Sequence, residues 1–338
     1  MSISLESQVL QRHLDLFSQK SVLFAGGIQD EFPKILQNTC HSVTVWSWFY
    51  DYATKLEQHL KTDHAVEFSA LNNKQADLIV YYWTKNKQEV QFQLMQLLAS
   101  AQENQVILII GENRCGVRSA EKILEPFGDI GKIDSARRCS LYHFTLSKRP
   151  NFNFDKFWQH YTLKNENNLK VAALPGVFSA NELDEGTKLL LSTLNKPLKG
   201  DILDVGCGAG VIGAFVKQQN PNVNITMTDI HAMAIESAKR TLKENNLEGQ
   251  VIASDVFSEV KGKFNLILSN PPFHNGIDTA YSAVTDLIIQ AKQYLKPHGE
   301  LRIVANRFLP YQDLLDQHFG SHQVLTKTNK FSVYSVTL

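Results

Sequence analysis

The segment NPPF at residues 270–273 follows an apolar run, residues 264–269, and carries groups that suit the binding of a flat amine. Proline cannot continue a central strand, so the chain must leave a sheet here with a rigid geometry. The side-chain oxygen of Asn270 and the carbonyl of Pro271 can accept hydrogen bonds from a planar NH2 group, and Phe273 can stack on its ring. Such acceptors return electron density to the nitrogen as it forms a new bond. The segment therefore predicts transfer chemistry on a ring-conjugated amine.

A second candidate site is the glycine-rich turn DVGCGAG at residues 204–210, which follows another apolar run. Gly206, Gly208 and Gly210 allow the backbone to turn sharply and to lie close to a ligand. Val211 stands where a dinucleotide fingerprint needs its third glycine, and the chain contains no phosphate loop of the GxxxxGK[ST] type. The turn therefore predicts a cofactor site, with a tight strand-to-helix connection as the alternative.

Two carboxylates follow the next expected strands. Asp229 ends the run NVNITMTD, where its carboxylate can accept hydrogen bonds from both hydroxyls of a ribose. Asp255 follows the short run QVIAS and can accept from the amine of a purine. Each acid alone is also typical of a solvated loop, but together with the glycine-rich turn they predict a nucleoside-binding edge.

The elements that must position these residues alternate between strands and helices, which is typical of an α/β fold with a largely parallel sheet. We expect strands at residues 201–205 and 264–269 and a helix at residues 211–219. Upstream, Ser179 and Glu182 match a capping box before a helix. The helix should have one buried face, made of Leu183, Thr187, Leu190 and Leu194.

The loop before that predicted cap should lie over the glycine-rich turn. Phe178 would then line the cofactor or the base, with a core contact against the helix as the alternative.

A repeat along the chain indicates a duplicated domain. Three segments of the first half recur in the same order in the second, at offsets of 188, 193 and 192: residues 76–83 with 264–271, 106–114 with 300–307, and 139–146 with 331–338. Pro150 and two asparagines interrupt the pattern near the middle. We therefore expect two tandem domains, residues 1–158 and 159–338.

The two copies differ in their chemistry. Residues 22–30 stand in the place of residues 202–210, and Phe24 occupies the position of the acid. Residues 81–84, with sequence YYWT, stand in the place of residues 269–272. Ile28 and Asp30 stand in the places of Gly208 and Gly210, and a bulky side chain and an acid where the backbone must approach a ligand would block that approach. The first domain is therefore predicted to be degenerate, with the fold kept and the site lost.

The set of DVGCGAG, Asp229, Asp255 and NPPF resembles the class I S-adenosylmethionine-dependent methyltransferases that methylate amines. The segment LPGVFSANELDEGTKLLL and the degenerate first half resemble, more closely and over the whole chain, the RsmC family of small-subunit ribosomal RNA guanine methyltransferases. The resemblance implies two tandem Rossmann-like domains, S-adenosyl-L-methionine as the cofactor, and the 2-amino group of a guanine in 16S rRNA of the small ribosomal subunit as the acceptor.

The resemblance also implies roles for individual residues. Asp229 would bind the ribose of the cofactor, Asp255 its adenine, and Asn270 would contact both cofactor and guanine. The methionine part would be held by Asp204, Gly206, Cys207, Gly208 and Gly210. The guanine would be held by Asn270, Pro271, Pro272 and Phe273. His274 is expected to contact RNA or support the site, because water suffices to take the proton.

Composition sets limits on these roles. The chain has 338 residues, more than the roughly 250 to 300 that one core supports. Its 34 basic residues balance 34 acidic ones, so RNA must be met by local charge. The four cysteines form no CxxC pair and none follows a proline, which argues against a metal site and a covalent intermediate. Without a long apolar run or signal peptide, the protein is expected to be cytoplasmic, and we expect a monomer.

Eight basic residues of the first domain are candidates for RNA contact, with solvated surface charge as the alternative. They are Lys85, Lys87, Arg114, Arg118, Arg137, Arg138, Lys148 and Arg149. Trp46, Trp48 and Trp83 can stack on bases or pack in the core, and the core is favoured. Three alternatives for function stay open: guanine methylation in large-subunit 23S rRNA, methylation of another amine or amide by the same motif, and a non-catalytic RNA-binding assembly factor.

Overall fold

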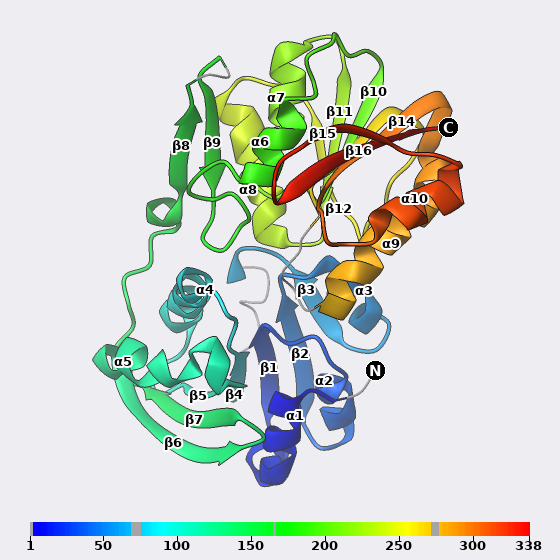
Figure 1. Ribbon diagram of the computed structural model, residues 1–338. Helices are drawn as coiled ribbons and strands as arrows, with labels where there is room; N and C mark the ends of the chain where they lie inside the picture. Colours follow the sequence, from blue (N-terminus) through cyan, green and yellow to red (C-terminus); the bar gives the residue numbers. More distant parts are fainter. Residues whose placement is uncertain (1–2, 69–75, 165–166, 272–276) are drawn as a thin grey trace. The chain divides into compact units, whose positions relative to one another are not determined.

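The computed structural model describes residues 3–68, 76–164, 167–271 and 277–338 (Figure 1). The chain divides into two compact units, Met1–Phe157 and Trp158–Leu338. A seven-stranded sheet forms the centre of each unit, with helices packed against it.

The sheet of the first unit has the strand order β3-β2-β1-β4-β5-β7-β6. Its strands are β1 (Ser21–Gly26), β2 (Ser42–Ser47), β3 (Lys61–His64), β4 (Leu78–Tyr82), β5 (Val106–Glu112), β6 (Gly128–Ala136) and β7 (Cys139–Leu146). Its helices are α1 (Leu5–Leu10), α2 (Phe32–Ile35), α3 (Tyr50–Glu57), α4 (Lys87–Ser100) and α5 (Ala120–Leu124), and a 3-10 helix, η1 (Gln11–Phe17), follows α1.

The sheet of the second unit has the strand order β12-β11-β10-β13-β14-β16-β15. Its strands are β10 (Asp201–Val205), β11 (Asn224–Asp229), β12 (Gln250–Ala253), β13 (Phe264–Ser269), β14 (Leu295–Asn306), β15 (Gln323–Lys327) and β16 (Phe331–Thr337). Its helices are α6 (Glu185–Leu191), α7 (Val211–Gln219), α8 (Ala232–Glu244), α9 (Ile277–Tyr294) and α10 (Tyr311–Phe319). An antiparallel hairpin, β8 (Gln159–Leu163) and β9 (Leu169–Ala173), packs on α8.

The two sheets share one topology, which confirms the predicted pair of Rossmann-like domains. In each, five parallel strands are followed by two strands that pair antiparallel. Val22 pairs with Leu78 in the first unit as Ile202 pairs with Leu266 in the second, so the offset of 188 is confirmed.

The offset of 193 predicted for the next segment is wrong by one residue. Val106 pairs with Leu78, whereas Glu300 pairs with Leu266, so the structural offset is 194. The sequence comparison aligned similar residue types, whereas strand pairing defines which residues of the two units are equivalent. A bulge between Phe264 and Leu266 shifts the pairing register in the second unit.

Several elements begin and end where the sequence predicted them. The strands β10 and β13 and the helix α7 occupy the expected residues because each apolar run is bounded by turn-forming residues. The buried side of α8 includes Ala234, Ala238 and Leu242, as the helical spacing requires.

The predicted capping box at Ser179 and Glu182 is wrong. Helix α6 begins at Glu185, and the carboxylate of Asp184 caps it by accepting from the backbone N–H of Thr187 at 2.9 Å. Ser179 has a φ of +59°, a left-handed conformation, whereas an N-cap residue needs an extended one. The predicted buried face is partly kept, because Thr187, Leu190 and Leu194 are buried.

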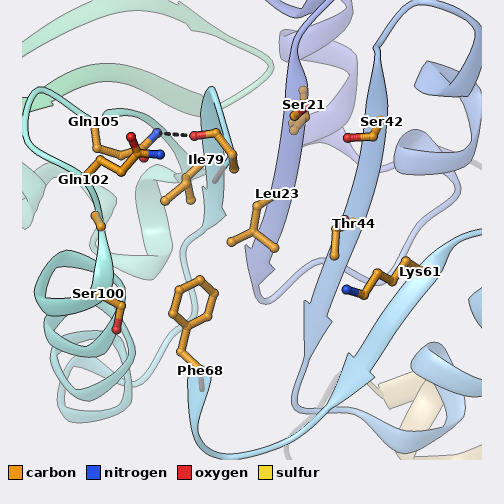
Figure 2. A pocket seen from close by; sticks show the side chains of 13 residues that line it. Ser21, Leu23, Ser42, Thr44, Lys61, Phe68, Ile79, Ser100, Gln102 and Gln105 are labelled. Carbon is orange, nitrogen blue, oxygen red and sulfur yellow. Dashed lines mark hydrogen bonds between the residues drawn. The ribbon is translucent and has the colours of Figure 1, made fainter. Parts of the chain in front are cut away.

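A small cavity of about 80 Å³ in the first unit lies at the amino ends of its parallel strands (Figure 2). Ser21, Ser42 and Lys61, which begin β1, β2 and β3, line it, and Gln105 beside it donates to the carbonyl of Ala76 at 3.0 Å. Open α/β sheets bind ligands at the carboxyl ends of their strands. This cavity is therefore no counterpart of a cofactor site.

Within the described part of the chain, no helix combines the length and the apolar character needed to cross a membrane. The same residues contain no group of three or more His, Cys, Asp or Glu side chains placed to hold a metal ion.

Candidate functional site

Asn270 lies at the carboxyl end of β13 and only 6% of it is exposed. Its side-chain Nδ2 donates to Oδ2 of Asp184 at 2.9 Å and to Oγ1 of Thr187 at 2.8 Å. Its Oδ1 is buried and meets no donor among the described residues. A buried carbonyl without a partner costs about 1–3 kcal/mol, so Oδ1 is suited to a donor that a ligand brings.

The rest of the predicted tetrad is only partly described. Pro271 is buried directly after Asn270, whereas Pro272 and Phe273 lie outside the described residues, as does His274. Stacking by Phe273 on a base therefore stays a prediction.

The glycine-rich turn joins β10 to α7 beside this motif. Ser269, the residue before Asn270, donates from its hydroxyl to the carbonyl of Val205 at 2.7 Å, so the ends of β13 and β10 are adjacent. The backbone N–H groups of Gly206 and Cys207 donate to the carbonyl of Thr228 at 2.8 and 2.9 Å. The turn is thus fastened between its two neighbouring strands.

The three glycines of the turn have positive φ angles, and their surroundings differ. A Cβ on Gly206 would meet nothing within 4 Å, so a ligand can approach its backbone. A Cβ on Gly208 would lie 3.3 Å from the carbonyl oxygen of Phe178. A Cβ on Gly210 would lie 2.9 Å from Cα of Ala238 in α8, so packing between helices requires this glycine.

The loop before α6 covers the turn as expected. Phe178 places its carbonyl and Cβ against Gly208, and 49% of Phe178 is exposed. The alternative, a buried contact of Phe178 in the core, is therefore wrong.

Asp204 is fully buried near the carboxyl end of β10, just before the turn. One carboxylate oxygen, Oδ2, accepts from the backbone N–H of Gly213 at 3.0 Å. The other, Oδ1, meets no donor among the described residues. Burial raises the pKa of Asp204 from its ordinary value of 3.8 to about 7, and the nearby carboxylate of Asp229 adds to the rise. Such a carboxyl is suited to a cationic group of a ligand.

Asp229 fastens the turn to α8 from the end of β11. Its Oδ2 accepts from the N–H of Gly208 and its Oδ1 from the N–H of His231, both at 2.9 Å. Burial raises the pKa of Asp229, and these backbone donors oppose the rise. Each oxygen keeps a lone pair for a hydroxyl. Asp255 is exposed in the turn after β12, the strand next to β11.

The first unit fills the corresponding positions with its own N-terminal segment, α1 and η1. Phe24 stands at the position of the buried acid and packs against Phe17, with 6.4 Å between ring centroids. Tyr82 stands at the position of the motif's asparagine, and its hydroxyl is 2.6 Å from Oγ of Ser7. The first unit therefore has an aromatic side chain at each of these two positions, in place of the buried carboxylate and the amide of the second unit.

Sequence reasoning missed Asp184 and did not predict that Thr187, expected only on a buried helix face, contacts Asn270. The signal was present, because Asp184 is a good N-cap and Glu185 follows it as an acid in the first turn. The capping box at Ser179 competed with it and was preferred.

The aromatic and basic candidates of the first unit are now placed. Trp46, Trp48 and Trp83 are buried, so the core interpretation is confirmed and stacking on bases is wrong. The eight basic residues named above are all exposed.

Comparison with known proteins places the whole chain. It matches the methyltransferase small domain N-terminal family over residues 7–161 and the methyltransferase small domain family over residues 168–335. Relatives named ribosomal RNA small subunit methyltransferase C are 65% identical in Actinobacillus succinogenes, 66% in Mannheimia succiniciproducens and 63% in Haemophilus influenzae. Each match covers 99% of both chains.

A solved structure shares the complete two-unit fold. It is the T. thermophilus 16S rRNA N2 G1207 methyltransferase (RsmC) in complex with AdoMet and guanosine, with a TM-score of 0.85 at 19% identity. The match covers 99% of this chain and 92% of that one. With the identities above 60%, these matches show that the chain belongs to the ribosomal RNA small subunit methyltransferase C family.

Proposed function

We propose that the protein transfers a methyl group from S-adenosyl-L-methionine to the exocyclic 2-amino group of a guanine in 16S rRNA. The buried Oδ1 of Asn270, which lacks a donor among the described residues, carries the proposal, since an amino group supplies that donor. The names of the relatives and the guanosine and AdoMet in the T. thermophilus complex support the choice of base and cofactor.

The residues of the turn fit this cofactor. The free oxygen of Asp204 and the open face of Gly206 suit its methionine part, and the carboxylate of Asp229 suits its ribose. Asp255 is proposed to accept from its adenine. When bound, the cofactor supplies a methyl group on a positively charged sulfur. Cys207 packs in the turn, and burial holds its pKa well above the ordinary value, so its thiol is no nucleophile.

In the proposed reaction, the side chain of Asn270 and the backbone of Pro271 bind the amino group of the base. Their carbonyl oxygens accept the two hydrogens of the amino group and hold its nitrogen in line for transfer. They stabilise the positive charge that develops on that nitrogen, and the extra proton leaves to water. Pro272 is proposed to keep the segment rigid and Phe273 to stack on the guanine.

The two domains are proposed to divide the task. Residues 159–338 hold the cofactor and the base. Residues 1–158 have lost the site and are proposed to dock the RNA through their exposed basic residues, as part of a monomer acting in the cytoplasm.

Methylation of defined RNA tests the proposal. The protein and labelled cofactor are incubated in separate reactions with small subunits, with large subunits and with deproteinised RNA, all from cells that lack this protein. The labelled base is then mapped. Label on the 2-amino group of one guanine in 16S rRNA is expected. Label in 23S rRNA, or on another base, would contradict it.

Replacing Asn270→Ala separates an enzyme from a non-catalytic assembly factor. We expect methyl transfer to fall by at least about 100-fold, because a charge-stabilising acceptor is lost at the reacting nitrogen. Cofactor affinity, measured by calorimetry, should be largely kept, because the proposed contacts of Asp204, Gly206 and Asp229 with the cofactor remain. Asn222→Ala, at an exposed asparagine of the same unit, is the matched control and should behave as wild type. Full transfer by Asn270→Ala would rule out the proposed role.

A further inference from the structure

The carboxylate of Asp184 makes two contacts with one oxygen. Its Oδ2 accepts from the backbone N–H of Thr187, which caps α6, and from Nδ2 of Asn270, both at 2.9 Å. Asp184 precedes Asn270 by 86 residues and lies in the loop before α6. A helix cap alone does not require the second contact.

The second contact decides which end of the Asn270 amide faces the site. An amide side chain has nearly the same shape after a half-turn that exchanges its oxygen and nitrogen. A carboxylate only accepts, so the exchanged amide would place its oxygen against that of Asp184 and lose a charge-assisted hydrogen bond. The hydroxyl of Thr187 both donates and accepts, so it holds either orientation.

We propose that Asp184 is a positioning residue for methyl transfer, which fixes Asn270 so that its carbonyl and not its NH2 faces the amino group. This proposal rests on the proposed role of Asn270. The carboxylate also polarises the amide through Nδ2, which makes Oδ1 a stronger acceptor. The negative charge of Asp184 thus acts on the substrate amino group through Asn270 and not by direct contact.

Three variants separate positioning from capping, because serine and asparagine are good N-caps and alanine is not. Asp184→Ala loses the cap and the contact with Asn270. Asp184→Ser keeps the cap, but its shorter side chain gives up the contact. Asp184→Asn keeps the cap and the size and loses the charge, so both amide orientations become available.

We expect kcat to fall by about 10- to 100-fold in Asp184→Ala and in Asp184→Ser, as for loss of a hydrogen bond to a charged group. The kcat of Asp184→Asn should fall less, by about 2- to 10-fold. The dissociation constant for S-adenosyl-L-methionine and the KM for RNA should stay within about twofold. The melting temperature of each variant is measured as well. Ser4→Ala, which removes the N-cap of α1 in the first unit, is the control for loss of a helix cap and should keep the wild-type kcat.

The outcomes are distinct. If capping is the whole role of Asp184, then Asp184→Ser and Asp184→Asn turn over as wild type, and the proposal is overturned. If Asp184→Ser does not fold, a wild-type kcat in Asp184→Asn overturns it alone. An active Asn270→Ala removes the role of Asn270 on which this proposal rests, and a wild-type protein that puts no label on a guanine of 16S rRNA removes the proposed function. An inactive Asn270→Ala beside active Asp184 variants removes only the positioning role.

Discussion

If Asp204 pairs with a cationic group of the cofactor, as proposed, cofactor binding should depend on pH. Because burial raises its pKa to about 7, the free protein holds a proton there below neutrality. Pairing with a cationic group requires the ionised form, so affinity should weaken by about tenfold for each pH unit below 7. Calorimetry between pH 5.5 and 8.5 measures this. Asp204→Asn should bind weakly with no such slope, and a flat profile for the wild-type protein would contradict the assignment.

The same carboxyl should lower the stability of the free protein at neutral pH. Its folded pKa lies above the ordinary value of 3.8, so the stability it contributes is present below pH 4 and is lost as pH rises through about 7. Asp204→Asn avoids the buried charge and should raise the free energy of unfolding by about 1–3 kcal/mol at pH 8, with little gain at pH 4. Urea unfolding at both values measures the difference. An equal gain at both would point to packing instead.

Residues with a local signature could be predicted, and residues defined by distant contacts could not. Asn270 follows an apolar run and Asp204 directly precedes the glycine-rich segment, so both could be proposed from their own neighbourhoods. Asp184 contacts Asn270 across 86 residues, and no spacing in the sequence records that contact. Its local signature, an N-cap, had a competitor at Ser179 that only the backbone angle excludes.

At the scale of elements, the glycines of the turn between β10 and α7 differ in what surrounds them. Gly206 faces open space, so Gly206→Ala should weaken cofactor binding at least about tenfold at a folding cost of about 1–2 kcal/mol from its φ of +72°. Gly210→Ala should destabilise the unit more, because its Cβ would meet Ala238 as well. Calorimetry and urea unfolding of both variants measure the contrast. Equal losses of stability would contradict it.

Strand and helix limits were predictable where apolar runs and turn residues agree, as in β10, β13 and α7. The register of β14 against β13 could not be predicted, because a bulge between Phe264 and Leu266 sets it and no sequence pattern indicates that bulge. Elements follow local chemistry, whereas their alignment follows the pairing of strands that are distant in sequence.

For the whole molecule, duplication supplied two copies of one topology, and the sequence revealed it through the order of matching segments. In the first copy, η1 packs against Phe24 through Phe17 and α1 contacts the hydroxyl of Tyr82 through Ser7, contacts that a comparison of motifs could not indicate. Phe17, Phe24 and Tyr82 all belong to the hydrophobic cluster of that unit.

The hairpin between β6 and β7 offers a test of the docking role of that copy. Its tip, Arg137 and Arg138, adopts φ angles of +50° and +64°, which favour Asn-Gly over two arginines. Keeping exposed arginines in this conformation lowers stability, and the proposed contact with phosphates would give them a function. The double variant Arg137→Asn with Arg138→Gly should therefore raise the free energy of unfolding by about 1 kcal/mol.

The same variant should weaken RNA binding and reduce the slope of log affinity against log salt by about 2, one for each phosphate contact. Cofactor affinity should not change, because the proposed cofactor residues all belong to the second unit. Lys55→Ala, at an exposed lysine of α3 outside the basic group, is the control. A stabilised variant with the wild-type salt slope would mean that the hairpin does not contact RNA, and docking would then depend on the remaining basic residues after β4, β5 and β7.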